Sequence, residues 1–390
     1  MSWKKVELGR ITKTQKGFAF KSSNYVEKGI PVVRVSDYTL DSISDNDLKY
    51  YPYEEKKNYL DFELHEKDVI IQTVGSWQNN PASVVGKVVR VPYYLEGALL
   101  NQNAVKLTPL KDIDNNYLFY RLKTDAFKGH VLGEARGAAN QASITLDTIK
   151  SFSFQLPDYK TQKRIGDILS TYDNLIENNQ KQIKLLEEVA QRLYKEWFVD
   201  LRFPGHESTK IIDGIPEGWN KGSLSNIALF KRGKTITKAQ VEKGDIPVVA
   251  GGLKPAYYHN KANTVAPVIT VSGSGANAGY TELYNIDVFA SDCSFADSKT
   301  TPNLFFVYCF LKNNKEMVNS LQKGAAQPHV YAKDINSINL LVPNTKLINK
   351  FCKLVAPYFE KIKILENQNK LTSQARDRLL PKLVNGELEV

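Results

Sequence analysis

Residues 165–197 read IGDILSTYDNLIENNQKQIKLLEEVAQRLYKEW, and this stretch decides the architecture. Apolar residues return every three or four positions, and no glycine or proline follows Gly166. A heptad repeat of this kind predicts a long helix that packs along its length against a partner helix. Asn179 is the one polar residue of the seam, where it either fixes the register of the pair or marks a local gap in packing. The seam consists of Ile165, Leu169, Tyr172, Ile176, Asn179, Ile183, Leu186, Ala190, Leu193 and Trp197.

A second long helix is predicted near the C-terminus. A strand-like run ends at Pro157 before the first helix, and another ends at Pro343 before residues 345–388. Pro357 is expected to bend this second helix, and Thr372, Arg376 and Pro381 to interrupt its end. A coil formed by the two helices would bury both seams. The second seam consists of Phe351, Val355, Tyr358, Ile362, Leu365, Asn369, Thr372, Arg376, Leu379 and Leu383.

The two helices belong to two copies of one repeat. Trp3, Leu8 and residues 30–33 recur 216 positions later, as Trp219, Leu224 and residues 246–249. From Gln141 to Leu193 the matching offset is 186, which gives the first copy about 30 additional residues. A period near 200 residues is too long for a solenoid unit, so the pattern indicates duplication of a whole module.

Each repeat begins with a globular part, residues 3–156 and 219–342. Short apolar runs at 30–35, 69–74, 84–91, 246–249 and 268–271 alternate with glycine, proline and asparagine turn signals. Helices are expected at 116–123 and 304–312. The sequence therefore predicts an α+β protein with two similar mixed α/β domains, each followed by a long helix.

Length and composition limit the number of domains and the classes of protein to which the chain can belong. A chain of 390 residues exceeds the roughly 250–300 residues of a single hydrophobic core, so at least two domains are expected. The longest apolar run, 304–311, is too short to span a membrane, and the N-terminus has no apolar segment typical of a signal peptide. The three cysteines, Cys293, Cys309 and Cys352, are too few for a disulfide framework, which indicates a reducing, cytoplasmic location.

Positive charge is concentrated in two places. The chain has 52 Lys and Arg against 42 Asp and Glu, a net charge of +10. Residues 1–21 and residues 221–243 each contain six basic residues and one acidic residue. Clusters of this kind at the start of both repeats favour a polyanionic partner.

Motifs of a catalytic centre are lacking in the sequence. Gly233-Lys234-Thr235 resembles the end of a phosphate-binding loop, but Ala228 stands at the position of the leading glycine. Asp45, Glu54 and Lys56 fit a nuclease pattern only at the level expected by chance in a charged chain. The five histidines show no metal-ligand spacing, and the cysteines form no CxxC pair. We therefore expect neither a catalytic residue nor a metal site in this chain.

Several segments resemble the DNA specificity (S) subunit of type I restriction–modification systems over essentially the whole chain. Residues 215–219 (IPEGW) resemble the opening of a target-recognition domain in that family, and Trp3…Val6…Leu8-Gly9 resembles a shortened copy of it. Residues 269–279 and 289–292 are similar to its core segments. The paired Gly-Ala-Ala…Gln turns and the two transitions from proline to long helix complete the pattern.

The resemblance implies an architecture and partners. Two target-recognition domains, 1–156 and 206–342, would each read one half of a split sequence in double-stranded DNA. Two helical regions, 157–205 and 343–390, would pair as an antiparallel coiled coil with pseudo-twofold symmetry. Two modification (methyltransferase) subunits would dock on the helices, and restriction (endonuclease and translocase) subunits would join them. S-adenosylmethionine, ATP and magnesium would belong to those partners, and this chain would be a non-catalytic recognition subunit.

The residues themselves suggest where DNA is contacted. Phosphates require cations, and base edges require Asn, Gln, Arg or Ser side chains. The same residue types also occupy solvated turns, so the pattern leaves both roles open for each residue. In the first repeat the candidates are Lys13, Lys16, Phe18, Lys21, Thr73, Ser76, Gln78, Asn79, Asn101, Gln102, Asn103, Arg136, Asn140 and Gln141. In the second they are Lys231, Arg232, Lys234, Lys238, Ser272, Ser274, Asn277, Asp292, Ser294, Lys323, Gln327 and His329.

Two other classes of protein fit the sequence less well. A coiled-coil scaffold without DNA contact would not need the basic clusters. A complete restriction enzyme would carry catalytic and cofactor motifs in a much longer chain. The sequence therefore favours a DNA-recognition subunit over both.

Overall fold

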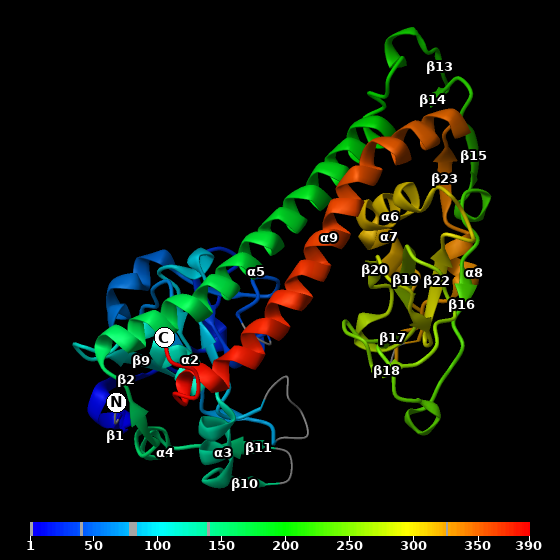
Figure 1. Cartoon of the computed structure of the whole chain (residues 1–390). Helices are drawn as coiled ribbons and strands as arrows, with labels where there is room; N and C mark the ends of the chain where they lie inside the picture. The colour runs from blue at the N-terminus through cyan, green and yellow to red at the C-terminus, as the bar shows by residue number, and fades with distance from the viewer. Residues whose placement is uncertain (1–2, 40–41, 78–83, 139–140, 325–326) are drawn as a thin grey trace. The chain divides into compact units, whose positions relative to one another are not determined.

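The computed structural model describes residues 3–39, 42–77, 84–138, 141–324 and 327–390 (Figure 1). The chain forms two compact units. The first unit comprises Met1–Glu177 and Lys370–Val390, and the second comprises Asn178–Asn369. Each unit therefore contains one globular part and one section of both long helices. No helix among the described residues is long and apolar enough to span a membrane.

The first unit is built on a four-stranded antiparallel sheet in the order β2-β9-β5-β7. Its strands are β2 (Thr12–Lys16), β9 (Ala104–Pro109), β5 (Val69–Gln72) and β7 (Val88–Arg90). The unit also has three small sheets. One consists of β4 (Lys49–Tyr51), β3 (Ile30–Val33) and β8 (Leu99–Leu100), and another of β10 (Arg136–Ala138), β11 (Gln141–Ser143) and β6 (Val74–Gly75). The third pairs β1 (Lys4–Glu7) with β12 (Ser153–Leu156). The helices of its globular part are α1 (Leu8–Ile11), α2 (Asn115–Leu122), α3 (Asp125–Gly133) and α4 (Leu146–Lys150).

The second unit repeats this arrangement. Its main sheet has the order β16-β22-β19-β20, formed by β16 (Lys231–Arg232), β22 (Cys293–Asp297), β19 (Val268–Ser272) and β20 (Thr281–Tyr284). One small sheet consists of β18 (Tyr257–His259), β17 (Ile246–Val249) and β21 (Phe289–Ala290). A second pairs β15 (Asn220–Ser223) with β23 (Asn339–Val342), and the third is the hairpin of β13 (Ile211–Ile212) and β14 (Ile215–Pro216). Its globular helices are α6 (Leu304–Asn313), α7 (Lys315–Ser320) and α8 (Ala332–Asn336).

The shared topology confirms the duplicated, mixed α/β architecture predicted from the sequence. In both units a parallel pair, β3 with β8 and β17 with β21, lies beside the main sheet. In both, the first and last strands of the globular part pair with each other, β1 with β12 and β15 with β23. The apolar runs predicted from the sequence contain β3, β5, β7, β17 and most of β19, whereas the other main-sheet strands lie outside them. The domain boundaries stay a prediction.

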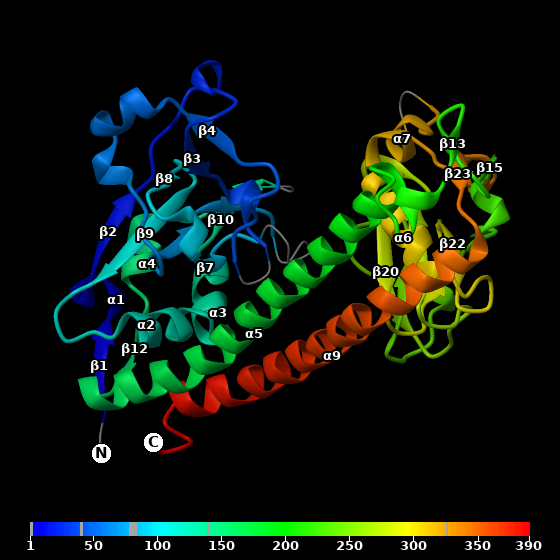
Figure 2. The same cartoon turned by 90° about the horizontal axis from the view of Figure 1, so that it is seen from above.

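The long helices are α5 (Tyr159–Tyr194), which continues into a π-helical turn over Lys195–Val199, and α9 (Thr345–Val384). Within each unit they lie side by side in two views (Figures 1 and 2). In the first unit Ile165 and Leu169 of α5 share a core with Leu383 and Val384 of α9. Because the start of α5 meets the end of α9, the pair is antiparallel there.

In the second unit the end of α5 meets the start of α9. Ala190 and Tyr194 of α5 lie in one core with Phe351, Val355 and Phe359 of α9. Every seam residue of the first helix is buried or half-buried, and so are Val355, Tyr358, Ile362, Leu365 and Leu379 of the second.

Asn179 is a buried seam residue with partners. It is 2% exposed, and its amide donates to Asn369 Oδ1 at 2.9 Å and to Gln368 Oε1 at 3.3 Å. The polar seam position is therefore hydrogen-bonded across the pair rather than left as a gap in packing. A buried amide that finds a partner only in one register is typical of a position that fixes register.

The expected interruption of the second helix is wrong. α9 runs without a break through Pro357, Arg376 and Pro381. Arg376 is buried, and its guanidinium pairs with Asp173 of α5 at 2.5 Å, which offsets the cost of burying the charge. The same carboxylate accepts from Arg90 of β7 at 3.0 Å and from the Tyr120 hydroxyl of α2 at 2.5 Å. This Asp173 cluster joins both helices to the globular part of the first unit.

Two glycines hold equivalent positions where a loop passes close to the sheet. A Cβ on Gly17 would overlap the carbonyl oxygen of Asn101, and a Cβ on Gly233 would overlap that of Ser291. The next residue in each copy, Phe18 or Lys234, donates its backbone N–H to Leu100 or Ala290 at 2.9 Å. A side chain at either glycine would push this hydrogen-bonded loop away.

Gly233→Ala is therefore expected to lower the free energy of unfolding of the second unit by about 1–3 kcal/mol, because the added methyl group meets backbone that cannot move aside. Urea denaturation measures the change. Gly129→Ala is the control, since nothing lies within 4 Å of a Cβ there and alanine in a helix is favoured by roughly 0.5–1 kcal/mol. Equal midpoints for Gly233→Ala and the parent chain would contradict the close approach.

Candidate nucleic-acid interface

In the first unit, backbone hydrogen bonds bring the polar segments predicted from the sequence next to one another. Phe18 forms a parallel bridge with Asn101 where β2 ends. Thr73 N–H donates to the carbonyl of Asn103 at 2.8 Å, and β6, which follows Thr73, pairs with β11. β11 in turn pairs with β10, where Arg136 lies opposite Ser143. Four segments that are far apart in the sequence therefore form one continuous polar strip.

The side chains of this strip differ in exposure. Thr73 and Asn101 are buried, with 6% and 8% of their surface exposed, so in this conformation their side chains are not available on the surface of the strip. Gln78, Asn79 and Asn140 lie outside the described residues. The half-buried candidates are Ser76, Gln102 and Asn103, and the exposed ones are Lys13, Lys16, Phe18, Lys21, Arg136 and Gln141.

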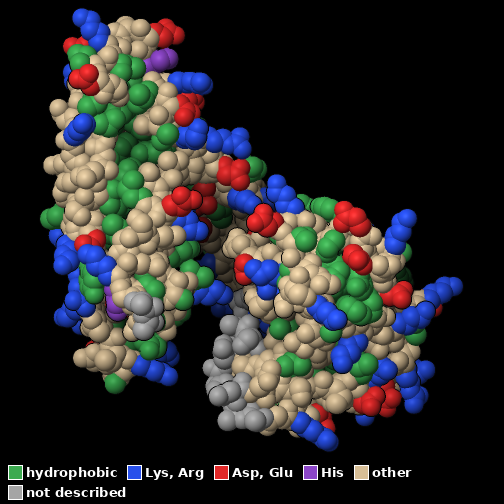
Figure 3. Space-filling view, turned by 180° about the vertical axis from the view of Figure 1, so that it is seen from behind, with side chains coloured by type: hydrophobic (Ala, Val, Ile, Leu, Met, Phe, Trp, Pro, Cys, Tyr) green, Lys and Arg blue, Asp and Glu red, His purple; other side chains and the backbone are tan. Residues whose placement is uncertain are grey.

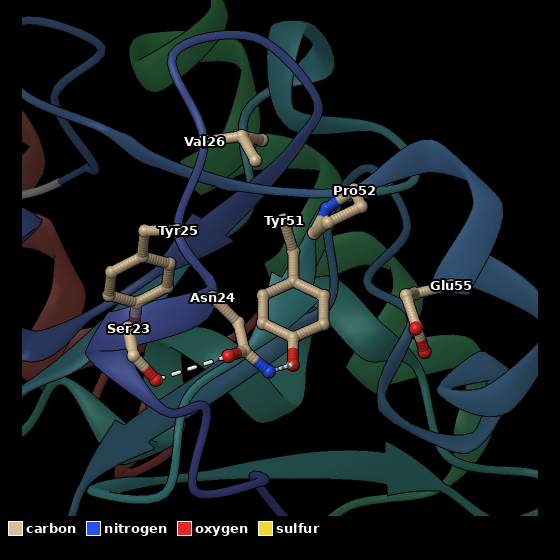
Figure 4. A pocket seen from close by; sticks show the side chains of 7 residues that line it. All are labelled: Ser23, Asn24, Tyr25, Val26, Tyr51, Pro52 and Glu55. Atoms are coloured by element: carbon tan, nitrogen blue, oxygen red, sulfur yellow. Dashed lines mark hydrogen bonds between the residues drawn. The ribbon is translucent and has the colours of Figure 1, made fainter.

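The first unit also has a recess of about 320 Å³, which is lined by residues 23–26 and by Tyr51, Pro52 and Glu55 (Figure 4). The Asn24 amide donates to the Tyr51 hydroxyl at 3.0 Å, and the Ser23 hydroxyl donates to Asn24 Oδ1 at 3.1 Å. The polar groups that face the recess are thus largely bonded to one another. Tyr51 packs against Phe20, whose ring contacts Phe18, so this recess continues the aromatic core beneath the end of β2.

In the second unit the candidates gather at one end of the main sheet. Arg232 of β16 lies opposite Ser294 of β22. The Ser274 hydroxyl, just beyond β19, donates to the Asp292 carboxylate. Ser274 also bridges His329, so the segment after β19 lies beside the turn before α8.

These residues border a recess of about 280 Å³. Four of the residues predicted from the sequence line it together: Arg232, Asp292, Ser294 and His329. The imidazole of His329 stacks on Tyr331, with ring centroids 5.9 Å apart. Cys293 also lines the recess, but burial raises the pKa of its thiol to about 12, so the thiol stays protonated at neutral pH.

The remaining candidates of the second unit surround this recess or lie beneath it. Ser272 and Ser294 are each 3% exposed, and the Ser272 hydroxyl has no hydrogen-bond partner among the described residues. Lys323 forms an ion pair with Asp334 at 2.7 Å, which partly neutralises its charge. Ser274, Asn277, Asp292 and His329 are half-buried, and Lys231, Arg232, Lys234, Lys238, Lys323 and Gln327 are exposed.

Net charge alone does not mark the interface. Figure 3 shows Lys and Arg side chains spread over the face drawn there, with acidic side chains among them. What distinguishes the two strand-end surfaces is the convergence of base-reading side chains with cations. No group of three or more His, Cys, Asp or Glu side chains that could hold a metal ion occurs among the described residues.

One correspondence between the two surfaces escaped the sequence comparison. Asn101 and Ser291 donate their backbone N–H groups to Val33 and Val249, which are equivalent residues of the two repeats. Thr73 and Gly273 likewise donate their backbone N–H groups to the carbonyls of Asn103 and Asp292, so Asn103 and Asp292 are equivalent as well. Their offset is 189, whereas the matched segments on either side have offsets of 216 and 186, and only the strand pairing reveals it.

Comparison with known proteins agrees with this geometry. Residues 1–188 and 216–372 match the family described as "Type I restriction modification DNA specificity domain". The chain is 26% identical over 422 residues to the type I restriction enzyme MjaIX specificity subunit of Methanocaldococcus jannaschii, across 100% of this chain and 96% of the relative. It is 24% identical over 349 residues to the HindI specificity subunit of Haemophilus influenzae, across 68% of this chain and 74% of the relative.

The fold is similar to the crystal structure of the type I restriction–modification S subunit from M. genitalium. The TM-score is 0.58 at 18% identity, and the match covers 98% of this chain and 96% of that chain. The family match takes in both globular parts and much of both long helices. The chain therefore belongs to the family of type I restriction–modification DNA specificity subunits.

Proposed function

We propose that this chain recognises a split sequence in double-stranded DNA, with each globular part reading one half-site. The observation that carries the proposal is the duplicated strand-end surface: in both units cations and base-reading side chains converge beside equivalent strands. Members of this family recognise DNA sequence, and two copies of one reading surface suit a target with two halves.

The exposed cations would contact phosphates. Lys13, Lys16 and Lys21 in the first unit and Lys231, Lys234 and Lys238 in the second are exposed, and none forms an ion pair in the part of the chain that the structure describes. Phosphate contacts position a protein on DNA but do not carry sequence information. Sequence would be read by the half-buried polar residues beside them, Gln102 and Asn103 in one unit and Asp292 and Asn277 in the other.

Methyl transfer and cleavage would belong to partner subunits. The sequence lacks the Asn/Asp-Pro-Pro-aromatic motif of an adenine methyltransferase and a complete phosphate-binding loop, which supports a recognition role without catalysis. S-adenosylmethionine, ATP and magnesium would then be bound by two modification subunits and by the restriction subunits. All of these would act in the cytoplasm, in keeping with three free, buried cysteines.

The long helices offer a surface for the modification subunits. Leu185 and Val189 of α5 are 60% and 45% exposed, and their spacing of four residues places them on one face of the helix. Leu354 and Ile364 of α9 are 46% and 59% exposed. Apolar side chains outside the seam on two paired helices are typical of a surface that a protein partner covers.

Reconstitution tests both parts of the proposal. The chain with S-adenosylmethionine and DNA is expected to transfer no methyl groups until a modification subunit is added, after which methylation should occur at one split sequence.

Leu185→Lys combined with Val189→Lys is expected to weaken co-purification of the modification subunit at least about tenfold, because two charges must be desolvated in the contact. Ile212→Lys is the control, since Ile212 is 61% exposed but belongs to β13 and to neither long helix. Methyl transfer by the chain alone would contradict the division of labour.

A further inference from the structure

Arg232 and Asp292 have opposite charges and line the same recess of the second unit, yet they form no ion pair with each other. Arg232 is exposed and has no hydrogen bond or ion pair from its side chain in the part of the chain that the structure describes. Asp292 is half-buried and accepts one hydrogen bond, from the Ser274 hydroxyl. A guanidinium and a carboxylate are thus both available to a ligand.

The backbone fixes both residues. Arg232 lies on β16 opposite Ser294, and Asp292 stands two residues before Ser294, at the entry to β22. Gly273 N–H donates to the Asp292 carbonyl at 3.1 Å, which ties the entry to β22 to the end of β19. The Ser274 hydroxyl holds one carboxylate oxygen of Asp292, so the other oxygen can accept from a ligand. The two charged groups therefore project from neighbouring, hydrogen-bonded segments.

The carboxylate of Asp292 indicates which part of DNA this recess binds. A carboxylate repels phosphate and weakens binding to the backbone, whereas at a base edge it accepts a hydrogen bond from an exocyclic amino group. An arginine fork matches two adjacent acceptors, the O6 and N7 atoms of guanine. Only a G·C pair shows these two acceptors in the major groove next to the N4 amino group of its partner.

We infer that this recess reads a G·C base pair in the major groove, with Arg232 donating to guanine O6 and N7 and Asp292 accepting from cytosine N4. The inference rests on the proposed function and names the base pair that one half-site contains. His329 and Ser294 line the same recess and complete its polar wall.

The first unit differs at the same two places. Lys16 stands at the position of Arg232 by the offset of 216, and Asn103 stands at the position of Asp292 by strand pairing. A lysine has no planar fork, and an asparagine amide both donates and accepts. The combination of fork and carboxylate is therefore specific to the second unit, so the G·C reading applies to the half-site of that unit.

The test uses the complex of the full chain with its modification subunit. Sequencing of methylated genomic DNA gives the split target of the parent chain, and exchange of residues 219–342 shows which half-site belongs to the second unit. Competition binding then compares all four base pairs at each position of that half-site. In Arg232→Ala and in Asp292→Asn, preference for G·C at one and the same position is expected to fall about 10- to 100-fold.

Lys231→Ala is the matched control on the same strand. It should weaken binding to all sequences alike and leave the base preference unchanged, as removal of a phosphate contact does. Because the Arg232 side chain is exposed and has no partner among the described residues, Arg232→Ala tests the inference even if Asp292→Asn fails to assemble.

The outcomes separate the inference from the proposed function. A second half-site without any G·C pair, or unchanged preference in Arg232→Ala, would overturn the inference while a split target is still recognised. Absence of any target that depends on this chain in the parent complex would overturn the proposed function itself.

Discussion

Exchanging residues 219–342 for the matching segment of another family member is expected to replace one half of the DNA target completely and leave the other half unchanged. The physical reason is that the segment begins and ends on one antiparallel ribbon, where Asn220 pairs with Val342 and Ser223 with Asn339. Its main sheet and its parallel pair lie between these two strands of the chain. The segment can therefore be transplanted at a single junction.

The measurement is the methylated motif recovered from cells that carry each chimera. The reciprocal exchange of residues 3–156, which likewise begin and end on a two-stranded ribbon, should change only the other half-site. The prediction fails if either exchange alters both half-sites, because the two globular parts would then read DNA together rather than separately.

Asp173→Ala is expected to destabilise the first unit by about 3 kcal/mol, because Arg90 and Arg376 lose the carboxylate that they share, while Arg376 keeps its pair with Asp377. The carboxylate of Asp173 is 18% exposed and faces Arg376 and Arg90, whose side chains are 10% and 15% exposed. Removing it leaves two guanidinium groups in a site with little water. Urea denaturation measures the loss, and hydrogen exchange should show faster exchange in residues 159–177 and 370–384.

Asp167→Ala is the matched control on the same helix. Its pair with Lys163 is exposed, with side chains that are 55% and 57% accessible, so its removal should leave the free energy of unfolding almost unchanged. Combining Asp173→Ala with Arg376→Ala should cost less than the sum of the two single changes, because fewer unpaired charges remain. Additive losses would contradict direct coupling of the two residues.

The second unit shows that this ionic arrangement is not imposed by the architecture. By the offset of 186, Asp173 corresponds to Phe359, and Arg376 corresponds to Ala190. Both of these lie in the apolar core of the second unit, where Phe359 stacks on Phe305 with ring centroids 4.4 Å apart. One duplicated position is therefore filled by an ion pair in one unit and by apolar packing in the other.

The sequence alone predicted the elements of this fold because their patterns are local or repeated. The seam of α5 was predicted from heptad spacing, since residues three and four apart share one face of a helix. The duplication was found from Trp3 and Trp219 at a fixed offset. The sequence predicts the start of α9 correctly, but heptad spacing marks Arg376 as an interruption because its partner, Asp173, lies 203 residues away.

The composition of the candidate surface was also predicted in part. Lys231, Arg232 and the segment from Ser272 to Asn277 were selected by residue type, and the structure places Arg232, Asp292, Ser294 and His329 around one recess. Residue type could not distinguish exposed from buried members, such as Ser294, because burial depends on which strand covers a position.

By itself, then, the sequence determined the repeat, the helix seams and the strand runs, all of which follow from covalent order and short-range periodicity. Only the tertiary structure decided that Asn103 and Asp292 are equivalent, that Asp173 meets Arg90 and Arg376, and that Arg232 and Asp292 share a recess. Each of these facts depends on strand pairing or packing between distant segments. Such contacts form only when distant segments pair and pack in the folded chain, and no pattern within one segment specifies them.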